Sequence, residues 1–290
     1  AGLEAAGALR GEIVLVPFAN PIGLSQRVLQ AVEGRFDLAS GENFNRRYAN
    51  LVSPACDWLV PRIAAGAAPT VELVREALRR ACAELPAATE LDSLRRVLLG
   101  LAIDAEVVLD LHCDNEAVLH LYTTPELWSD VEPLARLLGS RAVLMCELSG
   151  DEPFDEACSM VWPNVAAELG RRLGRKVVLP CACAAVTVEL RGEADVRHEL
   201  AAADAERIVQ YLAWRGLVDG APAALPPLEC EPTPLAGSIP LEAPHGGVVV
   251  FLRELGSVVL RGEPLVEIVD PLSGRATILE SPTEGVFYAR

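Results

Sequence analysis

A chain of 290 residues with 51% hydrophobic and 23% charged residues can bury a large core and has the composition of a globular protein rather than a disordered one. Its formal net charge of −16 would repel nucleic-acid phosphates and anionic lipid headgroups, and no run of Lys and Arg offsets that charge locally. Nucleic acid and membranes are therefore excluded as expected partners, and no uncharged apolar stretch of about 20 residues predicts a membrane span.

Short apolar runs alternate with longer segments of helical period, which is typical of an α/β protein whose mixed or parallel sheet is flanked by helices. The predicted strands of this part of the chain are Gly11–Phe18, Glu106–His112, Arg141–Leu148, Lys176–Leu179 and Ala185–Leu190. The predicted helices are Thr70–Leu85, Leu91–Leu101, Val131–Leu138, Asn164–Leu173 and Ala194–Arg215.

The composition changes after residue 217, where prolines interrupt any regular helix or ladder. We predict a catalytic-type domain over residues 1–217, a Pro-rich linker over 218–240 and a small all-β module over 241–290. The predicted strands of the module are Gly246–Phe251, Val258–Leu260, Pro264–Val269, Ala276–Leu279 and Gly285–Tyr288.

The β-module resembles biotinyl and lipoyl domains, in which a lysine carries the prosthetic group. Lys176 is the only lysine of this chain, so a swinging-arm carrier is excluded and an accessory, lid-like or assembly role is expected.

The eight cysteines are scattered through apolar or helical stretches, and no basic-plus-apolar signal peptide precedes them. Free thiols in a reducing cytoplasm are the expectation. The cysteines are Cys56, Cys82, Cys113, Cys146, Cys158, Cys181, Cys183 and Cys230.

A first polar cluster follows the Gly11–Phe18 run. An Asn-Pro turn at Asn20 leads, after Arg35, to the sequence NFNRRY, which contains Asn45 and Arg46. A guanidinium presents a planar fork of donors that suits a carboxylate, so Asn45 and Arg46 could grip an acidic ligand. An ordinary surface arginine in a loop is the competing interpretation.

A second cluster ends the strand predicted over Glu106–His112. A period of two places Asp110 and His112 on the same side of that strand. Catalytic groups gather at the carboxyl ends of strands in α/β sheets, and a carboxylate beside a metal-bound imidazole fixes its tautomer. A hydrogen-bonded structural histidine is the alternative, and His120 is a second histidine of this region.

The third cluster is Glu189, near the end of the apolar run Ala185–Leu190. A carboxylate there either faces solvent or lies in a polar site, because burying it without a partner is costly. In a polar site it would suit a general base.

In this order, N-P-x-G, N-x-N-R-x-[YF], D-L-H and T-V-E resemble the succinylglutamate desuccinylase/aspartoacylase family of carboxypeptidase-like zinc metallohydrolases. The resemblance runs from about Gly11 to Val196 and continues into the β-module. It implies a zinc-dependent amidohydrolase that cleaves N-acyl amino acids or similar small amides bearing a carboxylate. A homo-oligomer is compatible with it.

The resemblance also implies roles for individual residues. His112 matches a zinc ligand with Asp110 behind it, and Glu189 matches the carboxylate that activates water. Asn45 and Arg46 match the pair that holds the substrate carboxylate. Arg35 matches the residue that polarises the scissile carbonyl, with Arg27 as its rival.

One departure concerns zinc. The family takes two further ligands from an H-x-x-E motif upstream, and residues 1–10 contain no histidine. The sequence thus indicates either a fragment, which we favour, or a metal-free relative that binds acidic metabolites; a carboxypeptidase-like peptidase is the nearest enzymatic alternative. With His112 alone, the chain is not expected to hold stoichiometric zinc unless residues such as Glu116 or His120 complete the site.

Overall fold

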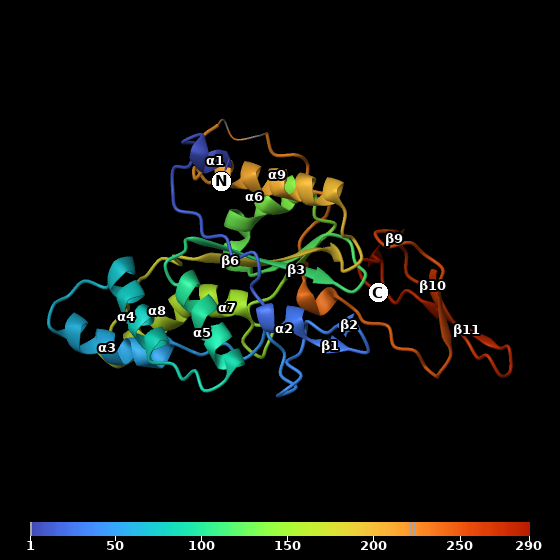
Figure 1. Ribbon diagram of the computed structural model, residues 1–290, viewed down its shortest axis with the longest axis horizontal. Helices are drawn as coiled ribbons and strands as arrows, with labels where there is room; N and C mark the ends of the chain where they lie inside the picture. Colours follow the sequence, from blue (N-terminus) through green and yellow to red (C-terminus); the bar gives the residue numbers. More distant parts are fainter. Residues whose placement is uncertain (1, 221, 223) are drawn as a thin grey trace. The chain divides into compact units, whose positions relative to one another are not determined.

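The computed structural model describes residues 2–220, 222 and 224–290 and forms two compact units, whose elements are labelled in Figure 1. The first unit comprises Ala1–Glu12, Leu111–Glu147 and Thr187–Arg290, and the second comprises Ile13–Asp110 and Leu148–Val186. The domain boundaries predicted at residues 217 and 240 stay a prediction. Residues 221 and 223 of the predicted linker lie outside the described residues.

Most elements belong wholly to one unit. Those of the second unit are α2 (Pro21–Ser25), β1 (Arg27–Val28), β2 (Ala31–Val32), α3 (Val52–Ala64), α4 (Val71–Ala83), α5 (Glu90–Ala102), α7 (Phe154–Ser159) and α8 (Val161–Leu173). Those of the first are α1 (Gly2–Ala5), β4 (His120–Thr123), η1 (Pro125–Leu127), α6 (Trp128–Leu138), β5 (Ala142–Met145), α9 (His198–Trp214), β7 (Thr233–Pro234), η2 (Leu235–Gly237), β8 (Val248–Phe251), β9 (Val258–Val259), β10 (Pro264–Val269), β11 (Ala276–Glu280) and β12 (Gly285–Val286).

The largest sheet has the strand order β3-β6-β4-β5-β7, in which β3 (Val107–Asp114) and β6 (Ala184–Gly192) have residues in both units. Strand β4 is parallel to β5 and antiparallel to β6, so the sheet is mixed. Together with its helices and the small antiparallel sheets at the C-terminal end, this confirms the predicted fold class.

The helix boundaries follow local chemistry. The Thr70 side chain accepts a hydrogen bond from the backbone at the start of α4, and Thr89 forms a reciprocal capping box with Asp92 in α5. Helices α6 and α8 end at Gly139 and Gly174, which have φ of 70° and 63°. Glycine adopts this left-handed conformation without a Cβ penalty, which makes it a common helix terminator.

Helix α3 was not predicted, because its sequence contains two prolines. Pro54 lies in the first turn, where a missing N–H group costs no helical hydrogen bond, and Pro61 lies close to the C-terminal end. Tertiary packing outweighs the remaining cost, since Cys56 and Leu59 are completely buried among residues of α4 and α8. This cluster is the core of the second unit.

The β-module strands are confirmed with small changes in their bounds. Strand β10 pairs antiparallel with β8 and β11, and β9 pairs with β12. The hydrophobic core of the β-module consists of Val259, Leu265, Val266 and Ile268.

Two predicted strands are wrong. Gly11–Phe18 and Lys176–Leu179 have no strand structure, although their β-branched and apolar residues favour it. A strand needs a hydrogen-bonded neighbour, and none of the described segments pairs with either run. The β-propensity of a residue indicates only how well it suits a hydrogen-bonded sheet, not whether a neighbouring strand is present.

No disulfide links the eight cysteines within the described chain, which agrees with the predicted thiols, but the cysteines differ in burial. Burial raises the pKa of Cys56 to about 11 and that of Cys183 to about 12. Cys113 and Cys181 are exposed. Among the helices of residues 2–220, 222 and 224–290, none is long and apolar enough to cross a membrane.

Replacing Leu59 with Ala should weaken the core of the second unit. We expect a loss of about 2–5 kcal/mol in the free energy of unfolding, because the lost transfer free energy adds to the cost of a cavity. Urea denaturation followed by circular dichroism measures it. Val178→Ala, at a side chain that is 73% exposed, is the control and should change stability by less than about 0.5 kcal/mol. Equal effects of both substitutions would contradict the assigned core.

Candidate functional site

The six predicted site residues fall into both units. Arg35, Asn45, Arg46 and Asp110 belong to the second unit, and His112 and Glu189 belong to the first.

The side-chain amide of Asn45 is the central polar contact of the second unit. Its Nδ2 donates to Oδ2 of Asp110 at 3.1 Å, and its Oδ1 accepts the backbone N–H of Phe154 at 2.9 Å. Two residues that the sequence singled out separately, Asn45 and Asp110, are therefore in direct contact.

The backbone after Asn45 is fixed against residues 151–154. The N–H groups of Arg47 and Tyr48 donate to the carbonyl oxygens of Asp151 and Glu152 at 2.7 and 3.1 Å. Arg47, Asp151 and Glu152 have φ between 50° and 58°, which non-glycine residues seldom adopt. The rings of Tyr48 and Phe154 lie 5.0 Å apart. This loop is held in a specific, strained shape.

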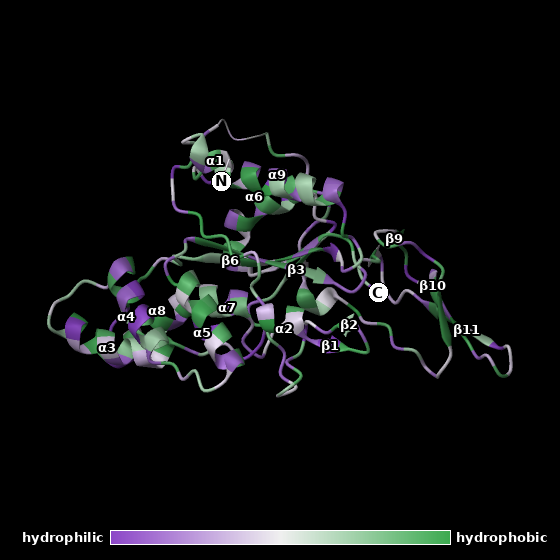
Figure 2. Ribbon diagram, in the orientation of Figure 1, coloured by the Kyte–Doolittle hydropathy of each residue, from purple (hydrophilic) through white to green (hydrophobic). Residues whose placement is uncertain are grey.

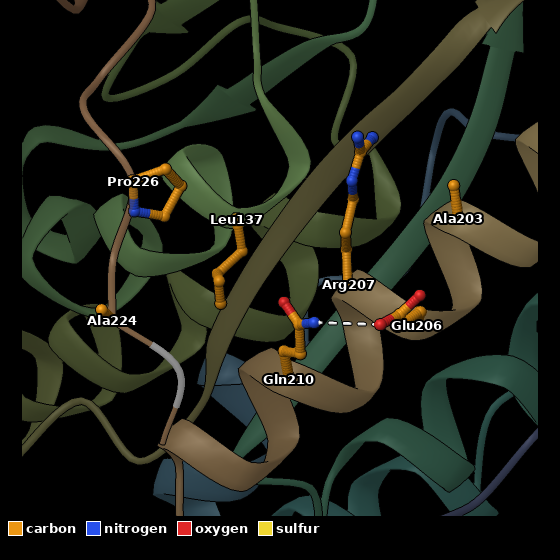
Figure 3. A pocket seen from close by; sticks show the side chains of 7 residues that line it. All are labelled: Leu137, Ala203, Glu206, Arg207, Gln210, Ala224 and Pro226. Carbon is orange, nitrogen blue, oxygen red and sulfur yellow. Dashed lines mark hydrogen bonds between the residues drawn. The ribbon is translucent and has the colours of Figure 1, made fainter. Parts of the chain in front are cut away.

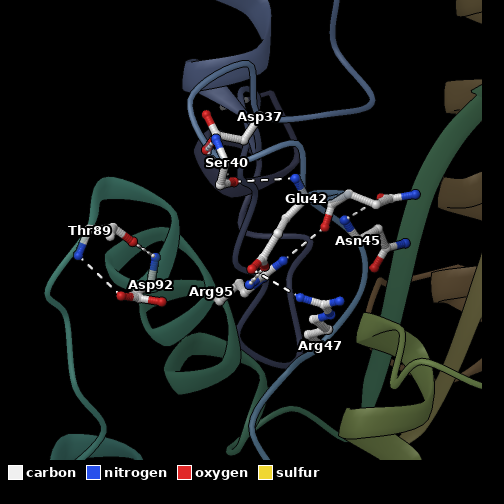
Figure 4. A network of polar contacts seen from close by, with 9 residues as sticks. Asp37, Ser40, Glu42, Asn45, Arg47, Thr89, Asp92 and Arg95 are labelled. Atoms are coloured by element: carbon white, nitrogen blue, oxygen red, sulfur yellow. Dashed lines mark hydrogen bonds and ion pairs between the residues drawn. The ribbon is translucent and has the colours of Figure 1, made fainter.

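A second set of contacts supports the loop from α5, and Figure 4 shows it. The guanidinium of Arg95, 9% exposed, donates to Oε2 of Glu42 and to the carbonyl oxygen of Asn43, both at 2.9 Å. Arg47 also pairs with Glu42, at 3.1 Å. The sequence did not reveal Arg95, because an arginine on an amphipathic helix resembles a surface residue.

The three arginines of the first cluster differ in their contacts. Arg27 donates to the carbonyl oxygens of Leu24 and Gln26 within its own turn, whereas the exposed Arg35 lies over the ring of Phe36. Arg46 is half-buried and donates to the carbonyl oxygen of Asn45 at 2.7 Å. Among the described residues Arg46 forms no ion pair, and its role in binding a carboxylate stays a prediction.

In the first unit, the last residues of β3 alternate between exposed and half-buried, as the side chains of a strand do. Leu111 and Cys113 are exposed, and His112 and Asp114 are half-buried. Glu189 is half-buried on β6, and its Cα pairs with that of His120 across the β4–β6 register. Opposed residues of an antiparallel pair point to the same face, so Glu189 and His120 share one face of the sheet.

His120 is completely buried. Its Nδ1 lies 2.8 Å from the carbonyl oxygen of Val118, to which it can only donate, so Nε2 carries the lone pair. The rings of Tyr122 and Tyr288 meet the imidazole edge-on at 5.3 and 5.2 Å. Tyr288 arrives from the β-module, where its carbonyl oxygen accepts the N–H of Val118 at 2.9 Å.

The described residues do not by themselves make a zinc site. Among residues 2–220, 222 and 224–290, no group of three or more His, Cys, Asp or Glu side chains could hold a metal ion. A catalytic zinc site uses three protein ligands and keeps one position open. The zinc-binding role that the family resemblance implies for His112 therefore stays a prediction.

One pocket of about 430 Å³ lies in the first unit and contains none of the predicted site residues (Figure 3). It is a shallow hollow beside α6 and α9. Its lining residues are Leu137, Ala203, Glu206, Arg207, Gln210, Ala224 and Pro226.

No protein-family model matches the sequence, and no curated protein matches it. Among solved structures, the chain is similar to a protein from Shewanella amazonensis assigned to the succinylglutamate desuccinylase/aspartoacylase family, with 27% identity and a TM-score of 0.75. That match covers 93% of this chain and 74% of the other. A protein from Shewanella frigidimarina with the same assignment is 26% identical with a TM-score of 0.75, covering 92% and 72%.

An aspartoacylase family protein from Mesorhizobium loti covers 98% of this chain and 73% of its own, with a TM-score of 0.55. At 14% identity it supports the fold alone. The family resemblance drawn from the sequence motifs is confirmed, because these neighbours carry the same assignment and match most of the chain.

The burial of His120 predicts a pH dependence of stability. Burial lowers the pKa of His120 below its ordinary value of 6.5, partly offset by its hydrogen bond to Val118 and the charge of Asp114. Near pH 6.5 the unfolded chain therefore binds a proton at His120 more readily than the folded chain does. The contribution of neutral His120 to the free energy of unfolding is complete above that pH. It is lost as the pH falls below it, by at most about 1.4 kcal/mol per pH unit.

His120→Phe should remove this component, so its unfolding free energy should fall less between pH 7.5 and 5.5 than that of the wild type. Urea titrations at both pH values measure the difference. His198→Gln, at an exposed histidine, is the control and should retain the wild-type pH dependence. An unchanged pH dependence in His120→Phe would contradict the assigned cause.

Proposed function

Because this chain is similar in structure and motif order to succinylglutamate desuccinylase/aspartoacylase proteins, we propose that it is an amidohydrolase of the deacylase type acting on N-acyl amino acids or similar small amides with a free carboxylate. The observation that carries the proposal is Arg46. Its half-buried guanidinium has no ion pair among the described residues of a chain with net charge −16, and it follows an asparagine fixed at both ends of its amide.

Arg46 would bind the substrate carboxylate. A guanidinium forms two parallel hydrogen bonds with a carboxylate, which fix orientation as well as supplying attraction. The contacts of Asn45 with Asp110 and Phe154 limit the motion of the adjoining backbone, so less entropy is lost when the ligand binds.

Glu189 would act as the general base. Its carboxylate would take a proton from the attacking water and return it to the leaving amine, so that amide and water give a carboxylate and an amine. Arg35 would stabilise the negative charge that develops on the carbonyl oxygen. We assign this role to Arg35 rather than Arg27, because the guanidinium of Arg27 is engaged by Leu24 and Gln26.

Zinc is the cofactor that the family resemblance implies, and His112 would be one of its ligands. The described residues offer no complete ligand set, so the steps assigned here are those of the chain's own side chains. The same observation favours a second candidate, a relative that binds acidic metabolites without hydrolysing them. Binding and turnover separate the two functions.

Glu189→Gln should lower the rate of amide hydrolysis by about 10²–10⁴-fold while leaving substrate affinity nearly unchanged, because it removes the proton acceptor and keeps the shape. Hydrolysis is followed by release of the free amine, and affinity by isothermal titration calorimetry. Glu193→Gln, at an exposed glutamate of the same region, should behave as wild type. Turnover by Glu189→Gln at the wild-type rate would remove Glu189 from the mechanism.

Arg46→Ala should weaken binding of an N-acyl amino acid by about 10–150-fold, corresponding to the roughly 1.5–3 kcal/mol of a charged hydrogen bond. The analogue in which an amide replaces the carboxylate should lose much less affinity, because it lacks the negative charge. Calorimetry with both ligands tests this without requiring turnover, and Arg197→Ala, at a side chain 66% exposed, is the control. Equal losses for the acid and the amide would show that Arg46 is structural only.

A further inference from the structure

The backbone of β6 is strained two residues after Glu189. The strand is apolar over most of its length, as can be followed in Figure 2, and its charged residues, Glu189 and Arg191, lie near its C-terminal end. Arg191 has a φ of 76°, which places a residue with a Cβ in the left-handed region. A left-handed residue within a strand redirects the chain, as in β-bulges, which are over-represented next to active sites. Because this conformation is unfavourable for arginine, the surrounding contacts have to maintain it.

The side chain of Arg191 forms a buried ion pair. Its guanidinium donates to Oδ2 of Asp204 on α9, and the two side chains are 17% and 9% exposed. Nε of Arg191 and Oδ1 of Asp204 are also buried and form no hydrogen bond within the described residues. Arg207 lies 3.9 Å from that Oδ1, which is too far for a hydrogen bond. Apolar residues of similar volume often stabilise a fold as well as such a pair does, so stability alone does not explain it.

The residues that follow Arg191 attach the end of β6 to the end of β3. A Cβ on Gly192 would lie 2.9 Å from the carbonyl oxygen of Asn115, so this close approach requires glycine. The N–H of Glu193 donates to the carbonyl oxygens of Asp114 and Asn115 at 2.8 and 3.2 Å. We call these contacts of residues 192–193 with residues 114–115 the strand junction.

The strand junction lies close to the two candidate residues of the first unit. His112 precedes it by two residues on β3, and Glu189 precedes it by three residues on β6. The conformation of Arg191 decides the path of β6 between Glu189 and the junction, because Arg191 is the left-handed residue between them. A change at Arg191 would therefore alter the position of Glu189 relative to His112.

From these contacts we propose that Arg191 and Asp204 are positioning residues for Glu189. Their ion pair maintains the left-handed conformation of Arg191 and thereby the separation between Glu189 and His112. Both residues act through Glu189 and are not assigned a contact with substrate. Catalytic groups have to be held within about 0.5 Å of the productive geometry, which accounts for a strained residue and a costly ion pair at this place. The catalytic meaning of the separation rests on the proposed function, whereas the separation itself does not.

The double substitution Arg191→Met/Asp204→Leu in the complete chain replaces the ion pair with apolar side chains and tests the proposal. Its stability in urea should equal or exceed that of the wild type. Turnover of an N-acyl amino acid should fall by about 10–100-fold, because a misplacement of about 1 Å can cost that much. Affinity measured by calorimetry should change by less than about threefold, because the substrate carboxylate is assigned to Arg46.

Two further variants and a matched control accompany this substitution. Arg191→Lys keeps the cation and should retain most of the wild-type turnover, whereas Asp204→Asn keeps the shape without the charge and should lower it. Arg215→Met/Asp130→Leu is the control, since it replaces another ion pair of α9, whose partner lies on α6 and whose side chains are 20% and 45% exposed. The control should turn over substrate as the wild type does.

Crystal structures of the wild type and of Arg191→Met/Asp204→Leu supply a measurement that does not require turnover. The separation between the Cα atoms of Glu189 and His112 should differ by at least about 0.5 Å. An unchanged separation would overturn the proposal whether or not the wild type hydrolyses amides, and so would equal turnover by an active wild type and the double variant. A changed separation together with a wild type that hydrolyses no N-acyl amino acid would overturn the proposed function and leave the positioning of Glu189 standing.

Discussion

The amide of Asn45 joins three segments that are distant in the sequence. Its Nδ2 contacts Asp110 near the middle of β3, its Oδ1 contacts Phe154 at the start of α7, and its own backbone leads to Arg46. Only a side chain with a donor at one end and an acceptor at the other can do this. Aspartate would retain the acceptor for Phe154 but would place a second carboxylate against Asp110.

The loop around Asn45 shows how a surface position can be made rigid without deep burial. Arg95 neutralises Glu42 from α5, and three residues of positive φ hold the chain path. The cost of those conformations is about 1–3 kcal/mol each and has to be met by the surrounding contacts. Such strain is expected where geometry matters more than stability, which agrees with a ligand-binding role for Arg46.

The sequence predicted the elements whose local signals and tertiary environment agree. Helices α4 and α5 begin at threonine caps, and β6 begins with five buried residues, Ala184–Val188. Prediction failed where the environment decided the outcome. Gly11–Phe18 has strand chemistry and no neighbouring strand, whereas α3 contains Pro61 and is retained by the burial of one face.

The sequence singled out candidate site residues but not the contacts between them. Motif order identified Asn45, Asp110 and Glu189, yet no spacing rule indicates that an asparagine lies 3.1 Å from an aspartate 65 residues away. The burial of His120 was equally hidden, because Tyr288, which covers it, belongs to a different part of the chain. Long-range packing of this kind leaves no periodic pattern in sequence.

The alternation of side chains along the end of β3 has a practical consequence. Cys113 faces solvent on the side of the strand opposite to His112. Burial, followed by the charge of Glu189, raises the pKa of the Cys113 thiol, so a thiol-specific fluorophore would attach slowly and best at alkaline pH. Once attached, it would lie one residue from His112 without occupying the histidine's side of the strand. Spectroscopy of the labelled protein could therefore follow changes around His112 from a position that leaves the imidazole unobstructed.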